Sequence, residues 1–235
     1  MTASIRMAVR RGIATIDIDA SEGRPSLDSA ARAQLLLSLR QVGDDPAISA
    51  VVLRGSGQDF CEGRDLDEGA ARLSRDPVIG VRELELQTAQ VVHMLATVHK
   101  PVIAAVRGRC TGEGLALALA CDLRVLADDA VLSTTSCELG EHPDRNLRAA
   151  LTRWVGVDRA RELTLGGRRF TAREALEWGL VADVVPSSHV VDVALGQAAM
   201  LARLPADQLD AAKIMLAGAA ALELEQALCA ASATS

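Results

Sequence analysis

Three glycines lie in a short segment that could hold a negative charge on backbone N–H groups. Gly108, Gly112 and Gly114 follow an apolar run at 102–106 and lead into an apolar helical pattern at 113–121. A strand that passes through a glycine-rich turn into a helix N-terminus presents unpaired N–H groups with the positive end of the helix dipole behind them. Such a turn can bind a phosphate or an oxyanion. Structural turns use the same glycines, so the spacing alone leaves a purely structural turn as the alternative.

A second loop that could take part in the same site lies upstream. The fragment 60–66, FCEGRDL, directly follows a strand-like run at 50–53. These two fragments, in this order and at this separation, resemble the crotonase superfamily of enoyl-CoA hydratases and isomerases. A later segment, WGLV at 178–181, extends the likeness, which covers residues 13–216. The resemblance implies an α/β fold with a crotonase-like ββα spiral core and a helical C-terminal part.

Family members bind acyl thioesters of coenzyme A, and two backbone N–H groups stabilise the enolate that forms on the thioester oxygen. By position, the resemblance implies that the donors here are the N–H groups of Arg64 and Glu113. The family usually has glycine or alanine where this chain has Glu113. A carboxylate beside an enolate would disfavour it. We therefore expect that Arg64 or Arg109 neutralises the Glu113 carboxylate, or that this side chain points away.

The two glutamates that serve as acid and base in hydratases of this family are replaced. The first lies two residues past the glycine-rich turn, where this chain has Ala116, and the second precedes a Leu-Gly pair, where it has Ser136. Adding water to a double bond needs one group to activate the water and one to deliver a proton. Alanine can do neither, and serine would need a base beside it. The resemblance is to a member that lacks both usual catalytic glutamates, so a standard hydratase mechanism is not expected.

Asp144 is the replacement candidate for proton transfer. It follows Pro143 at a position where dienoyl-CoA isomerases, dehalogenases and hydroxyisobutyryl-CoA hydrolases of this family place a catalytic aspartate. An aspartate just before a helix is also a common N-cap, and both interpretations stay open. Glu141 and Glu113 are further candidates for the catalytic role. The resemblance implies a coenzyme A contact for Arg24, whereas an arginine before proline is more often a plain surface residue.

Periodicity and turn residues predict the elements that must position these groups. Alternating apolar residues on both sides of residues 11–12 predict a β-hairpin. Helices are predicted at 28–42, ended by Gly43, and at 81–98, with a polar, weakly patterned stretch before the second. Apolar runs predict further strands, at 50–54, 102–106, 123–127, 131–133 and 180–185. Strands that alternate with helices indicate an α/β architecture.

Composition limits the classes of function. The chain has 235 residues and a net charge of −6 without a Lys/Arg run, which argues against a nucleic-acid partner. No stretch suits a signal peptide or a membrane span. The five cysteines form no CxxC pair, which predicts a reduced cytoplasmic protein without a metal site. We expect a ββα spiral core at 1–185 and a helical segment at 186–235 that is short for the family.

Two classes of function stay open from the sequence. The first is an enzyme of the lyase or isomerase type, with isomerase-like or hydrolase-like chemistry on an acyl-CoA. The second is a non-catalytic acyl-CoA carrier or regulatory binding protein that kept the pocket and lost its acid–base pair. Under either, the resemblance implies acyl-CoA as the partner, no cofactor besides that thioester, a place in fatty acid metabolism, and assembly as a homotrimer or hexamer. A structural role in a larger complex is a weaker third alternative.

Overall fold

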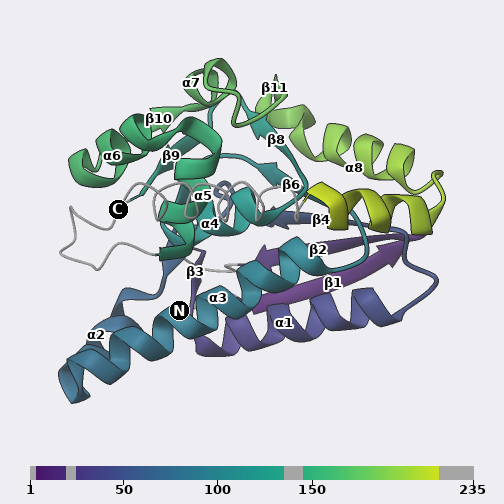
Figure 1. Cartoon of the computed structure of the whole chain (residues 1–235). Helices are drawn as coiled ribbons and strands as arrows, with labels where there is room; N and C mark the ends of the chain where they lie inside the picture. Colours follow the sequence, from purple (N-terminus) through teal and green to yellow (C-terminus); the bar gives the residue numbers. More distant parts are fainter. Residues whose placement is uncertain (1–3, 20–24, 135–144, 217–235) are drawn as a thin grey trace, which may run out of the picture.

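The computed structural model describes residues 4–19, 25–134 and 145–216, and a six-stranded sheet forms its centre (Figure 1). The strand order is β1-β2-β4-β6-β8-β11, and every neighbouring pair except β1–β2 is parallel. The strands are β1 (Ser4–Arg10), β2 (Ile13–Asp19), β4 (Ala50–Gly55), β6 (Val102–Val106), β8 (Leu123–Ala127) and β11 (Asp183–Val185). Because parallel strands need crossover connections, the helices between them must cover the faces of the sheet.

The antiparallel edge of the sheet is the hairpin that the sequence predicts. Strands β1 and β2 pair over their full length, from Ser4 opposite Asp19 to Arg10 opposite Ile13. The turn residues Arg11 and Gly12 have φ values of 51° and 77°. Two successive positive φ values match the right-handed twist of the strands that the turn joins.

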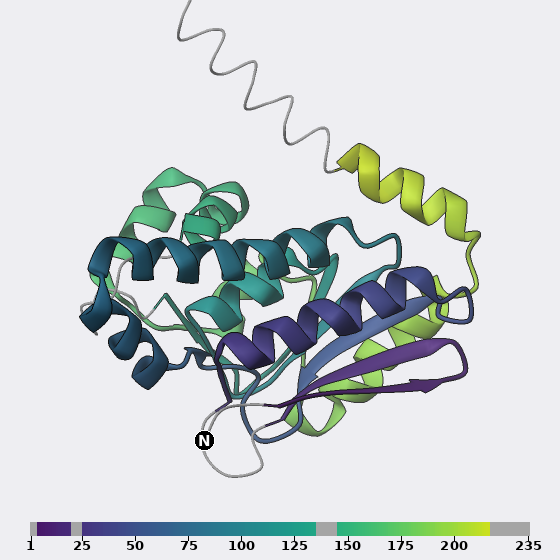
Figure 2. The same cartoon turned by 90° about the horizontal axis from the view of Figure 1, so that it is seen from below.

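Helices cover both faces of this sheet, as Figures 1 and 2 show together. Helices α1, α3 and α4 pack on one face, and α8 packs on the other against β4, β6 and β8. The described helices are α1 (Ser29–Asp44), α2 (Leu66–Arg75), α3 (Pro77–Thr97), α4 (Glu113–Ala120), α5 (Arg145–Val155), α6 (Val157–Gly166), α7 (Ala172–Glu177), η1 (Ser187–His189) and α8 (Val190–Leu201). A further helical segment at 206–216 follows α8.

Two short sheets connect the loops around the central one. Strand β3 (Ser26–Leu27) pairs in parallel with β5 (Gly63–Arg64). Strand β9 (Val131–Ser133) lies between β7 (Arg109–Thr111) and β10 (Phe170–Thr171). Both small sheets involve residues of the loops singled out in the sequence, so they determine where those loops lie.

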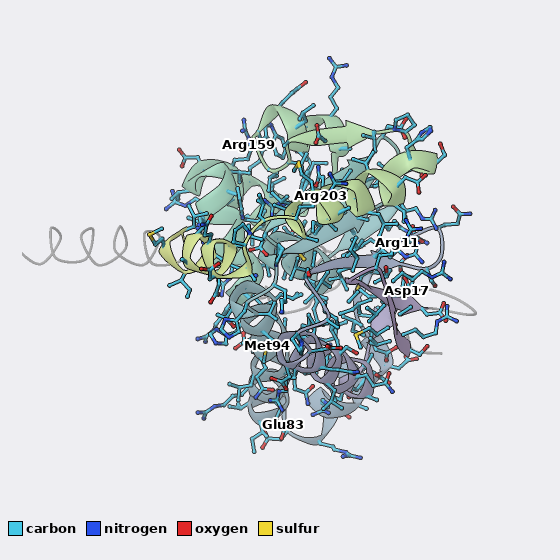
Figure 3. All side chains as sticks on the ribbon, turned by 90° about the vertical axis from the view of Figure 1, so that its right-hand side faces the viewer. Arg11, Asp17, Glu83, Met94, Arg159 and Arg203 are labelled. Carbon is cyan, nitrogen blue, oxygen red and sulfur yellow. The ribbon has the colours of Figure 1, made fainter. Side chains whose placement is uncertain are left out.

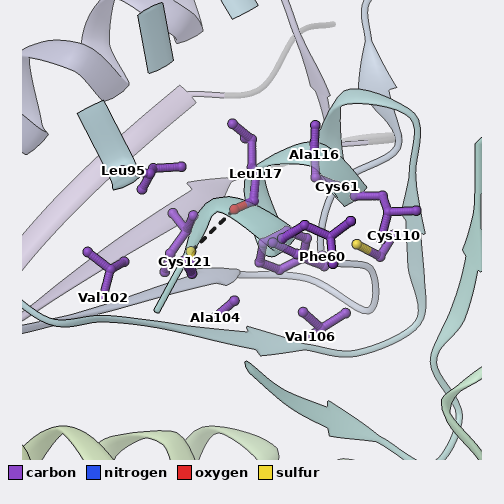
Figure 4. Close-up of a cluster of buried hydrophobic side chains, with 14 of the residues drawn as sticks. Phe60, Cys61, Leu95, Val102, Ala104, Val106, Cys110, Ala116, Leu117 and Cys121 are labelled. Atoms are coloured by element: carbon purple, nitrogen blue, oxygen red, sulfur yellow. Dashed lines mark hydrogen bonds between the residues drawn. The ribbon is translucent and has the colours of Figure 1, made fainter. Parts of the chain in front are cut away.

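The core follows from the alternation of side chains along the strands. On β4, Val51 and Leu53 face the α1 and α4 side, whereas Ala50 and Val52 face α8. Figure 4 shows part of the first cluster, in which Ala116 on α4 lies among buried side chains. Within the part of the chain that the structure describes, no helix combines the length and apolar character that a membrane span requires.

Three sequence predictions differ from the structure. Helix α1 continues through Gly43 to Asp44, because the chain leaves the helix only at Asp45, which precedes Pro46. The polar stretch before Pro77 contains helix α2, whose N-cap Asp65 accepts a hydrogen bond from Glu68 N–H at 2.9 Å. Strand β11 is shorter than predicted, since its pairing with β8 begins only at Asp183.

Charged side chains surround this core. In Figure 3, Glu83 on α3 and Arg159 on α6 lie toward opposite ends of the molecule. The Arg11 label lies near the β1–β2 edge, whose hairpin turn contains this residue.

Candidate functional site

The two glycine-bearing loops of the sequence analysis are packed against each other. Gly63 has a φ of 93°, and a Cβ atom there would lie 2.9 Å from the Thr111 carbonyl oxygen and 3.1 Å from the Glu113 nitrogen. A Cβ atom on Gly114 would lie 2.7 Å from the Cys61 Cβ and closer still to the Cys61 carbonyl oxygen. Any side chain at either position would push the loops apart. Glycine is therefore required here for close approach, and at Gly63 also for a left-handed backbone.

Hydrogen bonds hold the two loops in this arrangement. The Thr111 N–H donates to the Cys61 carbonyl at 2.9 Å, and the Phe60 N–H donates to the Arg109 carbonyl at 3.0 Å. The Thr111 hydroxyl donates to the Glu62 carbonyl at 2.8 Å. The loop 60–66 thus adds a short ladder to β7, which leads directly into helix α4.

The backbone N–H groups of Arg64 and Glu113 point away from the neighbouring ladders. The Asp65 N–H donates to the Leu27 carbonyl on β3 at 3.0 Å. Successive N–H groups along an extended strand point to opposite sides, so the Arg64 N–H points away from β3. Glu113 is the first residue of α4, and its N–H has no acceptor within that helix. Gly112, the N-cap, supplies no side-chain hydrogen bond to this helix end.

The side chain of Glu113 is buried and bound at both oxygens. Its Oε1 accepts from Arg32 Nε at 2.8 Å and from the Thr88 hydroxyl at 3.0 Å, and its Oε2 accepts from Arg32 Nη2 at 2.6 Å. Arg32 and Glu113 are only 1% and 3% exposed. Burial alone lowers the pKa of Arg32, but hydrogen bonds and charge attraction from Glu113 and Glu68 outweigh it, so the net pKa is raised.

The neutralising partner of Glu113 is neither of the two arginines that the sequence suggested. Arg109 instead pairs with Asp59 at 2.9 Å and with Glu62 at 2.6 Å. No hydrogen bond or ion pair is formed by the Arg64 side chain with the described residues, and its Nε is buried. Of the two alternatives expected for Glu113, the structure therefore does not have the one in which Arg64 or Arg109 neutralises the carboxylate, and the side chain is instead turned toward Arg32 on α1 and Thr88 on α3.

Arg32 is the residue that sequence reasoning missed, although a signal was present. On α1 the buried positions are Ala31, Arg32, Leu35, Leu39 and Val42. An arginine on the apolar side of a helix requires a buried partner, because an unpaired charge is costly to remove from water. The pattern thus marks Arg32 as paired, but the partner lies 81 positions away in the sequence.

The surroundings of Ala116 on α4 are apolar. Ala116 is 1% exposed and belongs to the cluster that contains Phe60, Cys61 and Cys110 (Figure 4). Burial raises the pKa of the Cys61 thiol to about 12, so this thiol stays protonated and a poor nucleophile at neutral pH. Among the described residues around α4, neither Ala116 nor its thiol neighbours offer a group suited to proton transfer.

Several predicted site residues lie outside the described part of the chain. These are Asp144, Glu141, Ser136 and Arg24. Their roles stay predictions. Within the described ranges, no three His, Cys, Asp or Glu side chains gather as a metal site would require.

A cavity of about 650 Å³ lies at the other end of α4. Its lining is mostly apolar and includes Leu119, Ala150, Trp154 and Leu209, with Asp122 also among the lining residues. The paired loops adjoin Glu113, whereas this cavity adjoins the last residues of the helix. The candidate site and this cavity therefore lie at opposite ends of α4.

The fold and the paired loops define an α/β protein with a candidate anion-binding helix N-terminus, and comparison with known proteins identifies its family. The profile of the enoyl-CoA hydratase/isomerase family matches residues 8–234. The chain belongs to this family. The predicted crotonase membership and fold class are both confirmed.

Individual relatives agree with this assignment. The chain is 38% identical over 174 residues to a 4-chlorobenzoyl coenzyme A dehalogenase of Arthrobacter sp, which covers 72% of this chain and 62% of that protein. It is 34% identical over 198 residues to the 1,2-epoxyphenylacetyl-CoA isomerase of Escherichia coli K12, covering 84% and 75%. An enoyl-CoA hydratase structure from Polaromonas sp. JS666 superposes with a TM-score of 0.89 at 29% identity, covering 96% and 88%. The chain thus spans less than two thirds of the dehalogenase that it matches.

Proposed function

We propose that this protein binds an acyl-coenzyme A thioester and stabilises its enolate with the backbone N–H groups of Arg64 and Glu113. The observation that carries the proposal is the contact of the two loops at Gly63 and Gly114. That contact brings one N–H turned away from its strand close to a helix N-terminus without a side-chain cap. Charge develops on one oxygen in enolisation, and donors that are already fixed toward it need no reorganisation.

The names of the relatives support a thioester ligand. The Arthrobacter relative is named for dehalogenation, the Escherichia coli relative for isomerisation and a Thauera aromatica relative for hydration, each of a coenzyme A ester. These reactions differ at the acyl group and share the thioester carbonyl. An oxyanion hole made of backbone N–H groups serves all of them, because it recognises that carbonyl alone.

We propose isomerase-like or hydrolase-like chemistry rather than standard hydration. Ala116 is buried among apolar side chains and cannot activate water. Asp144 is the proposed proton-transfer group, with Glu141 as the second candidate. Glu113 is disfavoured for that role, because both oxygens of its carboxylate already accept hydrogen bonds from Arg32 or Thr88. Arg24 is the proposed contact to the coenzyme A moiety.

The alternative is a non-catalytic acyl-CoA carrier or regulatory binding protein. The apolar surroundings of Ala116 favour it, since they leave the thioester site without the family's usual acid. The two proposals share the binding site and differ only in turnover. They can therefore be separated by one set of measurements.

The test combines calorimetry with turnover assays on a panel of enoyl-, dienoyl- and hydroxyacyl-CoA thioesters. Binding of at least one thioester with turnover that Asp144→Asn abolishes would support the enzyme. Binding without turnover of any thioester would support the carrier and overturn the enzyme. Absence of binding for the whole panel, with coenzyme A itself as a control, would overturn both.

The coenzyme A contact has its own test. Arg24→Ala is expected to weaken binding of both acyl-CoA and free coenzyme A, whereas Arg40→Ala, which removes an exposed arginine on α1, is expected to change neither. Equal affinities for the two variants would contradict the proposed role of Arg24. We also propose a homotrimer or hexamer, which analytical ultracentrifugation can test, and a monomer at micromolar concentration would contradict it.

A further inference from the structure

The residue that supplies one proposed oxyanion donor also carries a carboxylate. Glu113 begins α4, so its negative charge always lies within one side-chain length of its own N–H. A free carboxylate at this distance would oppose the negative charge of an enolate. The proposed site can work only if that charge is compensated or held at a distance.

Side chains on two other helices, α1 and α3, bind the Glu113 carboxylate. Arg32 on α1 binds both carboxylate oxygens, at 2.8 Å and 2.6 Å, and Thr88 on α3 donates to one of them at 3.0 Å. Two parallel N–H to oxygen bonds fix the plane of the carboxylate as well as its position. The Glu113 side chain is therefore turned toward α1 and α3, where both of its oxygens accept hydrogen bonds.

The same arginine is itself held in place. Arg32 Nη1 lies 3.4 Å from Glu68 Oε2 on α2. Glu68 accepts from the Ser29 hydroxyl at 2.6 Å and from Arg72 at 3.0 Å. Four helices thus meet in one network of hydrogen bonds around the N-terminus of α4. Such a network leaves the first residue of that helix little freedom to move.

Stability alone does not explain why an ion pair occupies this place. A buried ion pair is usually no more stabilising than apolar side chains of similar volume, because both charges lose their hydration. Apolar residues at 32 and 113 would fill the same space. Unlike apolar residues, the ion pair changes the electrostatic potential at the N-terminus of α4 and fixes the orientation of that helix end.

We propose that Arg32 is a positioning residue of the oxyanion hole, which neutralises Glu113 and fixes the N-terminus of α4 so that the Glu113 N–H can stabilise an enolate. The inference rests on the proposed function, because it assigns a role within that site. Arg32 does not contact the thioester in this arrangement. It acts through Glu113.

The test measures enolate formation directly, without requiring turnover. Acetoacetyl-CoA is the probe, because its enolate absorbs in the near ultraviolet and a protein that stabilises the thioester oxygen raises the enolate fraction above that of the free thioester at the same pH. In Arg32→Met an uncompensated carboxylate remains beside the hole, and the bound enolate fraction is expected to fall on the order of tenfold or more. The double variant Arg32→Met with Glu113→Gln has no carboxylate at this position. We expect it to regain most of the enolate fraction that Arg32→Met loses. Because removing the unpaired carboxylate also restores stability, the enolate fraction is compared at saturating acetoacetyl-CoA between variants that are fully folded, where a merely structural role leaves the fraction per bound ligand unchanged.

Two further variants keep the test decisive. If Arg32→Met does not fold, Arg32→Gln replaces it, since its amide can still donate to the carboxylate while the positive charge is lost. Arg124→Met removes another buried arginine, which donates to backbone carbonyls near the other end of α4, and is expected to leave enolate formation unchanged. An equal loss in Arg124→Met, or no rescue in the double variant, would overturn the role of Arg32.

The outcome for the wild-type protein separates this inference from the proposed function. If wild-type protein neither binds acetoacetyl-CoA nor raises its enolate fraction, the proposed function fails. If it does both and the Arg32 variants match it, only the positioning role fails. Circular dichroism of every variant confirms that each comparison is made between folded proteins.

Discussion

The two ends of helix α4 each have a buried arginine beside them, yet the two arginines meet different partners. At the N-terminal end Arg32 binds the carboxylate of Glu113. At the C-terminal end Arg124 donates to the carbonyls of Cys121 and Leu180, at 2.7 Å and 2.9 Å, and lies 4.3 Å from the centre of the Trp154 ring. A cation near a helix C-terminus satisfies orphan carbonyls and complements the helix dipole.

The pKa values of the two arginines show the same contrast. Burial lowers the pKa of Arg124, and the nearby Cys121 and Asp122 oppose that shift only in part. Burial also acts to lower the pKa of Arg32, but the Glu113 and Glu68 carboxylates reverse the direction. The C-terminal end of α4 thus uses its arginine to satisfy backbone acceptors. At the N-terminal end, Arg32 binds the Glu113 side chain, and the backbone N–H groups of that helix end stay available as donors.

The largest expected effect is on the Arg32–Glu113 pair itself. Arg32→Met strands a buried carboxylate, and we expect the free energy of unfolding to fall by about 3–5 kcal/mol. Arg124→Met strands two carbonyls that are not charged, and we expect about 1–3 kcal/mol. Urea unfolding followed by circular dichroism measures both. Equal losses would remove the distinction between the two ends of α4.

The contact between the loops gives the next prediction. Gly114→Ala places a methyl group against Cys61, and we expect a loss of about 1–3 kcal/mol in the free energy of unfolding. The matched control is Gly196→Ala on α8, where an added Cβ meets no atom within 4 Å and a gain of about 0.5–1 kcal/mol is expected. Calorimetric affinity for acetoacetyl-CoA should fall in the first variant alone. A neutral Gly114→Ala would mean that the close approach is not needed.

Buried thiols lie near both ends of α4 and give the smallest effect, which depends on pH. Burial raises the pKa of both Cys61 and Cys121 to about 12, from an ordinary value of 9.0. The thiol pKa is higher in the folded protein than in the unfolded chain. The contribution of each protonated, buried thiol to the free energy of unfolding is therefore complete below pH 9 and is lost as the pH rises toward 12. At pH 10, one unit above the ordinary thiol value, we expect each thiol to contribute a loss on the order of 1 kcal/mol in the free energy of unfolding.

Urea titrations between pH 8 and pH 10 test this prediction. The free energy of unfolding should fall less steeply between pH 8 and pH 10 in Cys61→Ala and in Cys121→Ala than in the wild-type protein. The two variants should differ from the wild type by similar amounts, although only Cys61 lies beside the candidate site. A much larger change for Cys61→Ala would indicate that this thiol differs from an ordinary buried one. The comparison would then have to include chemistry at Cys61.

Local sequence patterns predicted much of the fold. The hairpin at residues 11–12 and the strands β6, β8 and β9 were all predicted, because apolar runs and turn residues act over a few neighbouring positions. Helix α2 was missed, because its residues Leu66–Arg75 are mostly polar and its stability depends on packing and on the Asp65 cap.

The candidate site was predicted only in its backbone half. The glycines of the two loops are visible in the sequence, whereas the donor roles of Arg64 and Glu113 were implied by the family resemblance and stay predictions. Their contact at Gly63 and Gly114 depends on β3, β5 and β7, which are too short to leave a periodic pattern. The sequence left two alternatives for the Glu113 carboxylate, a nearby arginine or a side chain that points away, and it did not indicate that the distant Arg32 binds it.

By itself, the sequence of this protein determined the longer strands and most of the helices that pack on the sheet, the two glycine-bearing loops and the presence of an alanine at position 116. These features depend on neighbouring residues and on positions within motifs. Only the tertiary structure decided that the loops touch and that Arg32, 81 positions from Glu113, cancels its charge. The reason is physical, because two buried charges attract according to their distance in space and leave no trace in the spacing along the chain.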